Sequence, residues 1–161
     1  MAKQLPIELF MPPNILKAKV GGTVAGIDMA AMKRAEAAME NLKTEFSDWM
    51  SKDVERLAAA YERFNKEPSQ ASRDDLFRAS HDMKGQAGTF NFPLIARAAS
   101  SLCKLIEETK TVGALPPTLV EAHVAAIRVI FHEKIKGAAD TTAQLLMNEL
   151  DARVKETLAA L

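Results

Sequence analysis

The stretch RASHDMKGQAGTFNF, residues 78–92, places a histidine three residues before a lysine and then contains two glycines, Gly85 and Gly88. Apart from these glycines the stretch has the apolar spacing of a helix. A glycine inside a helix costs about 1 kcal/mol relative to alanine, so the pair weakens the element that contains it. We therefore expect something large to approach this part of the helix surface.

On the predicted helix, the histidine lies on the face opposite the core-facing side. Its apolar residues share one narrow sector: Leu76, Met83, Ala87 and Phe90. At about 100° per residue, His81 lies about 160° from Met83, and Gly85 and Gly88 fall on the same outer face as His81. Lys84 borders this face. The spacing thus predicts an exposed histidine beside a surface without side chains.

Residues of these types suit nucleophilic chemistry. A neutral imidazole is a good nucleophile near neutral pH, and a lysine one turn away offsets the charge of a phosphoryl group on the ring. His81 and Lys84 have this spacing. The alternative interpretation is an ordinary surface histidine with flexible neighbours, which spacing alone does not exclude.

Further helices are predicted on both sides of this stretch. A long amphipathic helix extends from Asp28 to about Asn65, either continuous or bent near residues 51–53, because it contains no glycine or proline. Its apolar positions are Ala35, Met39, Leu42, Phe46, Trp49, Leu57, Ala60 and Phe64. The helix that carries His81 opens at Ser72, where Ser72 and Asp75 have the form of a capping box.

Three more helices follow. One begins at Pro93 and ends by Gly113, the next extends from about Thr118 to Lys136 with Gly137 as its C-cap, and Asp140 caps the last. The last helix has one apolar side: Leu146, Leu150, Val154, Leu158 and Leu161. Amphipathic helices with short connections and no strand signal predict an all-α fold, an antiparallel up-and-down four-helix bundle with an additional helix.

Residues 1–27 contain three prolines and three glycines, which predicts an irregular N-terminal arm before a bundle domain over residues 28–161. The 161 residues carry 21 basic and 21 acidic side chains, so no global field favours nucleic acid or a membrane surface as a partner. Without a signal peptide or a long apolar run, a cytoplasmic location is expected.

Metal and disulfide chemistry have little support. Cys103 is the only cysteine, which excludes an internal disulfide and a zinc site built on cysteines. His123 and His132 lie about 180° apart around their predicted helix and cannot share a metal ion there. We expect both to be surface or boundary residues, and no metal site in this chain.

The segment HDMKGQAGTFNF, residues 81–92, resembles the phosphorylation-site motif of histidine-containing phosphotransfer (HPt) domains, in which H-x-x-K-G precedes small residues and a hydrophobic one. Its AGTF portion is similar to the phosphotransfer domain of chemotaxis histidine kinases. The resemblance implies that His81 is the phosphoacceptor and that Lys84 stabilises the phosphoryl group. It also implies that Gly85 gives a docking receiver domain clearance. We predict that the receiver docks on the face around His81 that includes Phe77, Gly85 and Gly88.

One position departs from the family pattern. A residue on the helix after the acceptor, often Glu or Gln, hydrogen-bonds the second ring nitrogen in HPt domains, and the aligned position here is Cys103. A thiol is a poor substitute. Either a backbone carbonyl, Ser100 or a water orients the ring, or the site is less strongly activated; Ser100 and Glu107 are candidate neighbours of His81.

Two functions follow as hypotheses. The first is a phosphocarrier of a two-component phosphorelay, with response-regulator receiver domains and a histidine kinase or hybrid kinase as partners. The sequence shows no nucleotide-binding loop, so we expect a phosphocarrier rather than a complete histidine kinase. No cofactor is expected in this chain, and the family implies a divalent metal ion in the partner receiver. The second hypothesis is a helical adaptor or dimerisation protein with an inactive HPt fold.

Overall fold

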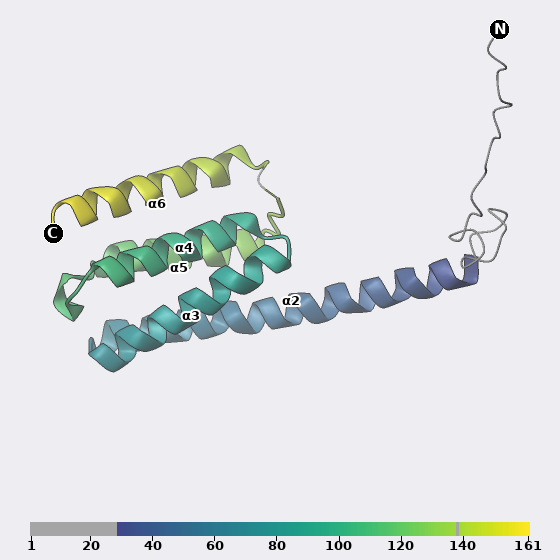
Figure 1. The fold of residues 1–161 in the computed structure, drawn as a ribbon, viewed down its shortest axis with the longest axis horizontal. Helices are drawn as coiled ribbons and strands as arrows, with labels where there is room; N and C mark the ends of the chain where they lie inside the picture. The colour runs from purple at the N-terminus through teal and green to yellow at the C-terminus, as the bar shows by residue number, and fades with distance from the viewer. Residues whose placement is uncertain (1–28, 138) are drawn as a thin grey trace, which may run out of the picture. The chain divides into compact units, whose positions relative to one another are not determined.

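The computed structural model describes residues 29–137 and 139–161, and these residues form helices joined by short loops (Figure 1). The helices are α2 (Met29–Lys66), α3 (Gln70–Thr89), α4 (Pro93–Glu108), α5 (Pro117–His132) and α6 (Thr141–Ala159), with a 3₁₀ turn, η1 (Val112–Ala114), before α5. The all-helical fold class is confirmed. The predicted arm over residues 1–27 lies outside the described residues. No described helix combines the length and hydropathy needed to cross a bilayer.

The chain divides into two compact units, residues 1–41 and residues 42–161, so the division falls within α2. In the first unit, the described side chains of residues 30–41 are exposed. The second unit contains the rest of α2 and the four later helices, and its core draws on all five. The site predicted from the sequence lies entirely in this second unit.

Four helices of the second unit form a closed ring. The Arg56 guanidinium of α2 pairs with Asp82 of α3 at 2.6 Å, α3 packs along α4, and α4 packs along α5. A groove lined by Glu55 and Ala58 of α2 and by Arg128 and Phe131 of α5 lies between these helices, so α5 lies beside α2 and closes the ring. The bundle therefore consists of α2, α3, α4 and α5.

The additional helix is α6, which packs against α4 and α5. Its position is fixed by Arg97 of α4, whose guanidinium donates to Asp151 at 2.7 Å and to Asn148 at 2.8 Å. The predicted cap is confirmed, because the Asp140 carboxylate accepts the Ala143 N–H at 2.8 Å. The sequence left open which four helices form the bundle, and these contacts decide it.

Helix α3 has a capping box, but it begins one box earlier than predicted: Ser72 is its second residue and not its first. The Ser72 N–H donates to Ser69 Oγ at 3.2 Å, and the Ser69 N–H donates to Ser72 Oγ at 3.0 Å. Ser69 is thus the N-cap and Ser72 the reciprocal residue, so the predicted pair of Ser72 and Asp75 was wrong. The helix begins at Gln70.

Two helix ends were also predicted too late. The helix α4 begins at Pro93, as expected, but ends at Glu108, where Arg73 of α3 donates to the carbonyls of Ile106 and Thr109. The helix α5 ends at His132 rather than Lys136. Lys134 takes a φ of 52° there and its N–H donates to the Phe131 carbonyl, so a lysine fills the left-handed position expected of Gly137.

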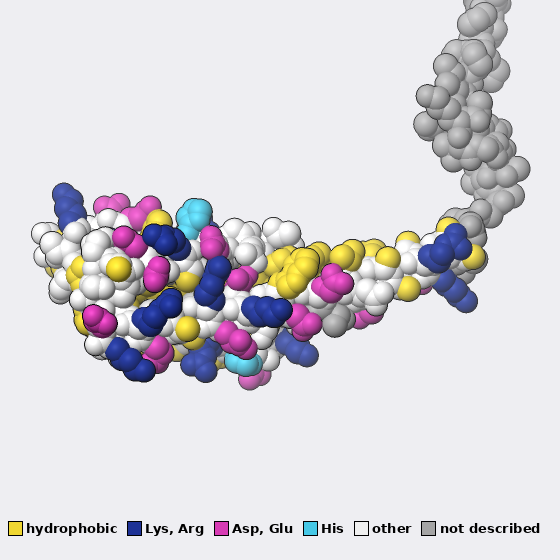
Figure 2. Space-filling model, turned by 90° about the horizontal axis from the view of Figure 1, so that it is seen from below, with side chains coloured by type: hydrophobic (Ala, Val, Ile, Leu, Met, Phe, Trp, Pro, Cys, Tyr) yellow, Lys and Arg dark blue, Asp and Glu magenta, His cyan; other side chains and the backbone are white. Residues whose placement is uncertain are grey.

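Several apolar side chains lie on the surface. Long helix α2 is continuous, but Met39, Leu42 and Trp49 on it are exposed, and Figure 2 shows a row of hydrophobic side chains along this helix. Leu146 on α6 and Leu161 beyond its end are exposed too. The core-facing side of α6 contains four residues: Ala143, Met147, Leu150 and Val154. The predicted α6 stripe was therefore partly wrong.

Candidate functional site

Helix α3 presents His81 to solvent. The buried residues of α3 lie on its other side: Leu76, Ala79, Ser80, Met83 and Ala87. His81, Lys84, Gly85 and Gly88 are all exposed. The sequence predicted that these four residues lie on or beside the exposed face of the helix, and all four are exposed in the structure. The helix ends only at Thr89, so both glycines are within it.

The glycines are required neither by packing nor by backbone conformation. A Cβ atom added at Gly85 or Gly88 meets no other atom within 4 Å. The left-handed residue that ends α3 is Asn91, with a φ of 63°. Glycine at positions 85 and 88 therefore costs helix stability without relieving a clash, and its effect is to leave the surface next to His81 without side chains.

Phe77 lies one turn before His81 and bounds the other end of this surface. The two ring centroids are 6.0 Å apart, with an angle of 36° between the ring planes. Phe77 is half-buried and packs against the hydrophobic core. Because the core holds Phe77 in place, its ring restricts the space into which the imidazole can turn.

Lys84 of α3 and Glu107 of α4 both lie close enough to Cys103 of α4 to act electrostatically on its thiol. Burial raises the pKa of the Cys103 thiol to about 11, the Lys84 ammonium acts to lower it, and the Glu107 carboxylate acts to raise it. The thiol is therefore protonated at neutral pH and offers only a weak hydrogen-bond donor. The tertiary structure thus brings together three of the residues named from the sequence.

Ser100 lies on another side of α4. It lines a groove between α4 and α6, together with Arg97 and Asp151. Within the described residues, no hydrogen bond joins the His81 ring to Ser100, Cys103 or Glu107. Arg97 belongs to the α6 contact and not to the surface around His81.

Ion pairs beside His81 were not predicted from the sequence. The residue after His81, Asp82, forms an ion pair with Arg56 of α2. Asp75 forms ion pairs with Arg63 at 3.8 Å and with Arg78 at 3.6 Å. The sequence feature that could have indicated these pairs is the seven-residue spacing of Arg56 and Arg63, which places both on one side of α2. The sequence did not show which helix that side faces.

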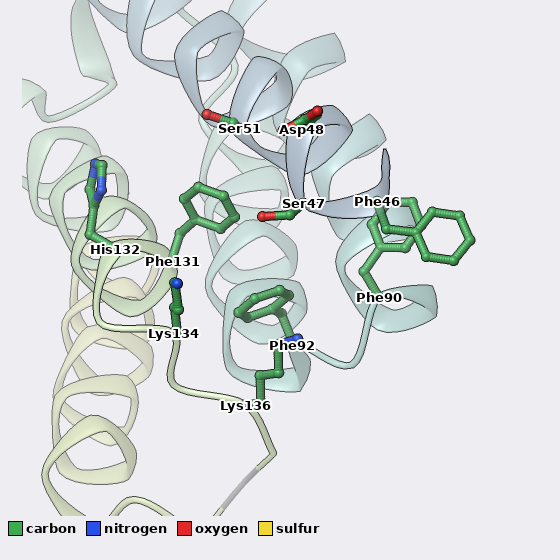
Figure 3. A pocket seen from close by; sticks show the side chains of 10 residues that line it. All are labelled: Phe46, Ser47, Asp48, Ser51, Phe90, Phe92, Phe131, His132, Lys134 and Lys136. Carbon is green, nitrogen blue, oxygen red and sulfur yellow. The ribbon is translucent and has the colours of Figure 1, made fainter. Parts of the chain in front are cut away.

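The two other histidines have different surroundings. His123 was expected near the surface but is fully buried, and its Nδ1 lies 2.7 Å from the Leu119 carbonyl oxygen. His132 is exposed and lines an open hollow of about 390 Å³ with Phe90, Phe92 and Phe131 (Figure 3). This hollow includes none of the site residues named from the sequence.

Among the described residues, no cluster of three or more His, Cys, Asp or Glu side chains could hold a metal ion.

Comparison with known protein families gives a match. The family model described as the Hpt domain matches residues 41–130, more than half of the chain. The matched range extends from α2 into α5, contains every site residue named above on α3 and α4, and leaves out α6. No curated protein and no solved structure matched the chain.

Proposed function

The chain belongs to the Hpt domain family, and we propose that it is a phosphorelay carrier that accepts a phosphoryl group on His81. Hpt domains are phosphocarrier modules that act in histidine phosphotransfer with histidine kinases and response regulators. Two histidines lie in the matched range, His81 and His123. Because His123 is fully buried, only His81 offers a ring to a partner, and this observation carries the proposal.

The proposed reaction needs little from this chain besides position. A ring nitrogen of neutral His81 attacks the phosphorus of an aspartyl phosphate on a receiver domain. An N–P bond forms, the bond between phosphorus and the carboxylate oxygen breaks, and the carboxylate leaves with the electron pair. The receiver supplies the divalent metal ion for this step. A second receiver reverses the reaction, with its aspartate as the nucleophile.

The residues around His81 have separate roles in this proposal. Lys84, one turn along α3, places an exposed ammonium where it offsets the charge of the phosphoryl group. Gly85 and Gly88 leave room for the receiver backbone, since no side chain stands on that surface. Phe77 forms the apolar edge of the contact, next to the imidazole.

The test is phosphoryl transfer to the purified chain from phosphorylated receiver domains, and in parallel from an autophosphorylated histidine kinase. We expect the wild type to become labelled and His81→Gln to remain unlabelled. His132→Gln is the matched control, because His132 is also exposed, and it should be labelled like the wild type. The label should be lost in acid and retained in base, as for a phosphohistidine. Equal labelling of His81→Gln would refute His81 as the acceptor.

The alternative proposal is an adaptor with an inactive Hpt fold. The buried, protonated Cys103 favours it, since a weak donor stands where the family commonly has Glu or Gln. An adaptor needs the surface around His81 but not the ring itself. It therefore predicts that His81→Gln keeps both partner binding and signalling in cells, whereas a phosphocarrier loses signalling and keeps binding.

A further inference from the structure

Two pairs of aromatic rings line the hollow beside His132. Phe46 of α2 stacks on Phe90, the residue after α3, with the ring centroids 4.8 Å apart and 29° between the planes. Phe92, the residue before α4, meets Phe131 of α5 at 5.8 Å and 53°. Phe92 is buried and the other three rings are partly exposed. The hollow therefore presents aromatic surface to solvent.

Basic side chains outnumber acidic ones around this aromatic surface. Lys134, Lys136 and His132 line the hollow, and Asp48 contributes its one carboxylate. Both lysines are exposed, and among the described residues no ion pair joins either of them to a carboxylate. In Figure 3 the Lys134 ammonium and the Ser47 hydroxyl lie around the same space as two of the rings. The hollow thus combines aromatic surface with an excess of positive charge.

The loop that carries the two lysines is held against the turn between α3 and α4. The Gly137 N–H donates to the Asn91 carbonyl at 3.4 Å, and the Lys136 ammonium lies 5.5 Å from the centre of the Phe92 ring. A cation is attracted to the face of an aromatic ring, so Lys136 already takes the place that a cationic ligand would occupy there. The hollow is therefore better matched to an anion.

Lys134 has a backbone conformation in which glycine would be more stable. Its φ is 52°, in the left-handed region, and its N–H donates to the Phe131 carbonyl where α5 ends. This conformation is uncommon for a residue with a long side chain, because the Cβ atom crowds a backbone carbonyl oxygen. The end of α5 does not require a lysine, so the residue is explained best by its ammonium, which lines the hollow.

We propose that this hollow binds a small anion with a planar aromatic body, such as an aryl carboxylate, sulfonate or phosphate. The aromatic body contacts the Phe92 and Phe131 rings, and the anionic group lies between the Lys134 and Lys136 ammoniums. The volume of about 390 Å³ is within the range of small-molecule sites. The hollow is distinct from the surface around His81, which contributes none of its lining residues.

The test is a fluorescence titration of the full chain with anilinonaphthalene sulfonate, an aromatic anion whose emission rises when its rings leave water. The matched control is phenylnaphthylamine, which has the same rings without the sulfonate. We expect saturable binding of the sulfonate that weakens with added sodium chloride, and weaker binding of the neutral compound. Equal affinity for the two compounds would overturn the proposal.

Lysine variants assign the binding to the hollow. Lys134→Gln with Lys136→Gln should raise the Kd for the sulfonate about tenfold, because two partly exposed charged contacts are lost. Lys66→Gln with Lys110→Gln removes the same charge at exposed positions outside the hollow and should leave the Kd unchanged. Both double variants should keep the helix content of the wild type by circular dichroism. An unchanged Kd in the first double variant would refute the hollow as the anion site.

Lys134→Gly distinguishes ligand binding from a structural role of this lysine. Glycine adopts the left-handed conformation without strain, so the variant should raise the urea midpoint of unfolding. Binding of the sulfonate should weaken at the same time, because the ammonium is lost. A variant that binds the sulfonate as tightly as the wild type would show that Lys134 does not contact the anion.

Amide chemical shifts locate the bound sulfonate. On titration, the largest changes in the spectrum of the ¹⁵N-labelled chain should fall on residues that line the hollow, such as Ser47, Phe90, Phe131 and Lys134. Changes confined to the exposed residues 30–41 of α2 would place the sulfonate on the apolar side chains there and refute the proposed site.

Discussion

Burial raises the pKa of the Cys103 thiol to about 11, and the Lys84 ammonium across the α3–α4 contact acts against this rise. The thiol thus remains neutral beside the lysine that we propose to stabilise the phosphoryl group. A neutral thiol orients a neighbouring imidazole poorly, because it is a weak donor and a weak acceptor. If His81 is the phosphoacceptor, as we propose, we therefore expect its ring to be less firmly oriented than the family pattern implies.

Replacement of Cys103 by glutamine tests this interpretation. We expect Cys103→Gln to raise the initial rate of phosphoryl transfer to the chain several-fold, because an amide can hold one tautomer of His81. Cys103→Ser is the control for loss of the thiol without added length and should have little effect. A folded Cys103→Gln chain that accepts phosphate no faster than Cys103→Ser would show that position 103 does not orient the ring.

Substitutions at Gly85 should change the free energy of unfolding and the rate of phosphoryl transfer independently. Because a Cβ atom there meets nothing, Gly85→Ala should raise the free energy of unfolding by about 0.5–1 kcal/mol, the difference between the two residues inside a helix. Gly85→Gln should keep the helix content but slow transfer from a receiver. Gly113→Gln, at an equally open position in η1, should transfer normally. Normal transfer by Gly85→Gln would mean that the partner does not approach this surface.

Arg97 should matter more to stability than other surface arginines. It donates to Asp151 and Asn148, and only about a third of the Arg97 and Asp151 side chains is exposed, at 35% and 30%. We expect Arg97→Ala to lower the free energy of unfolding by about 1–2 kcal/mol, after allowance for solvent screening. The measurement is urea denaturation. Arg153→Ala, which removes two exposed ion pairs on α6, should change the midpoint far less.

His123 should make stability depend on pH. Burial lowers its pKa from the ordinary value of 6.5, while the Leu119 carbonyl and Asp151 act to raise it. The unfolded chain then binds more protons than the folded one below pH 6.5, so this contribution to stability is complete above that value and is lost as the pH falls. His123→Leu should flatten the dependence of the urea midpoint between about pH 8 and about pH 5. An unchanged slope in this variant would assign the dependence to other groups.

Local sequence determined the elements and the exposed face of α3. The apolar spacing of three and four residues defines a helix and its buried side, Pro93 and Asp140 mark two helix starts, and the angle between Met83 and His81 follows from the helical period. These features depend on residues within a few turns of each other. For that reason the surface around His81 could be inferred before its neighbours were known.

The tertiary structure alone decided which helix covers each face. The burial of His123, the pairing of Arg56 with Asp82, and the position of α6 on Arg97 all join residues far apart in sequence. On α2, too, the sequence alone did not predict burial. Trp49 is exposed and neighbouring Met50 is buried, although both are apolar residues of one helix. Periodicity gives the direction of a side chain around its own axis, whereas burial depends on whether another helix lies in that direction.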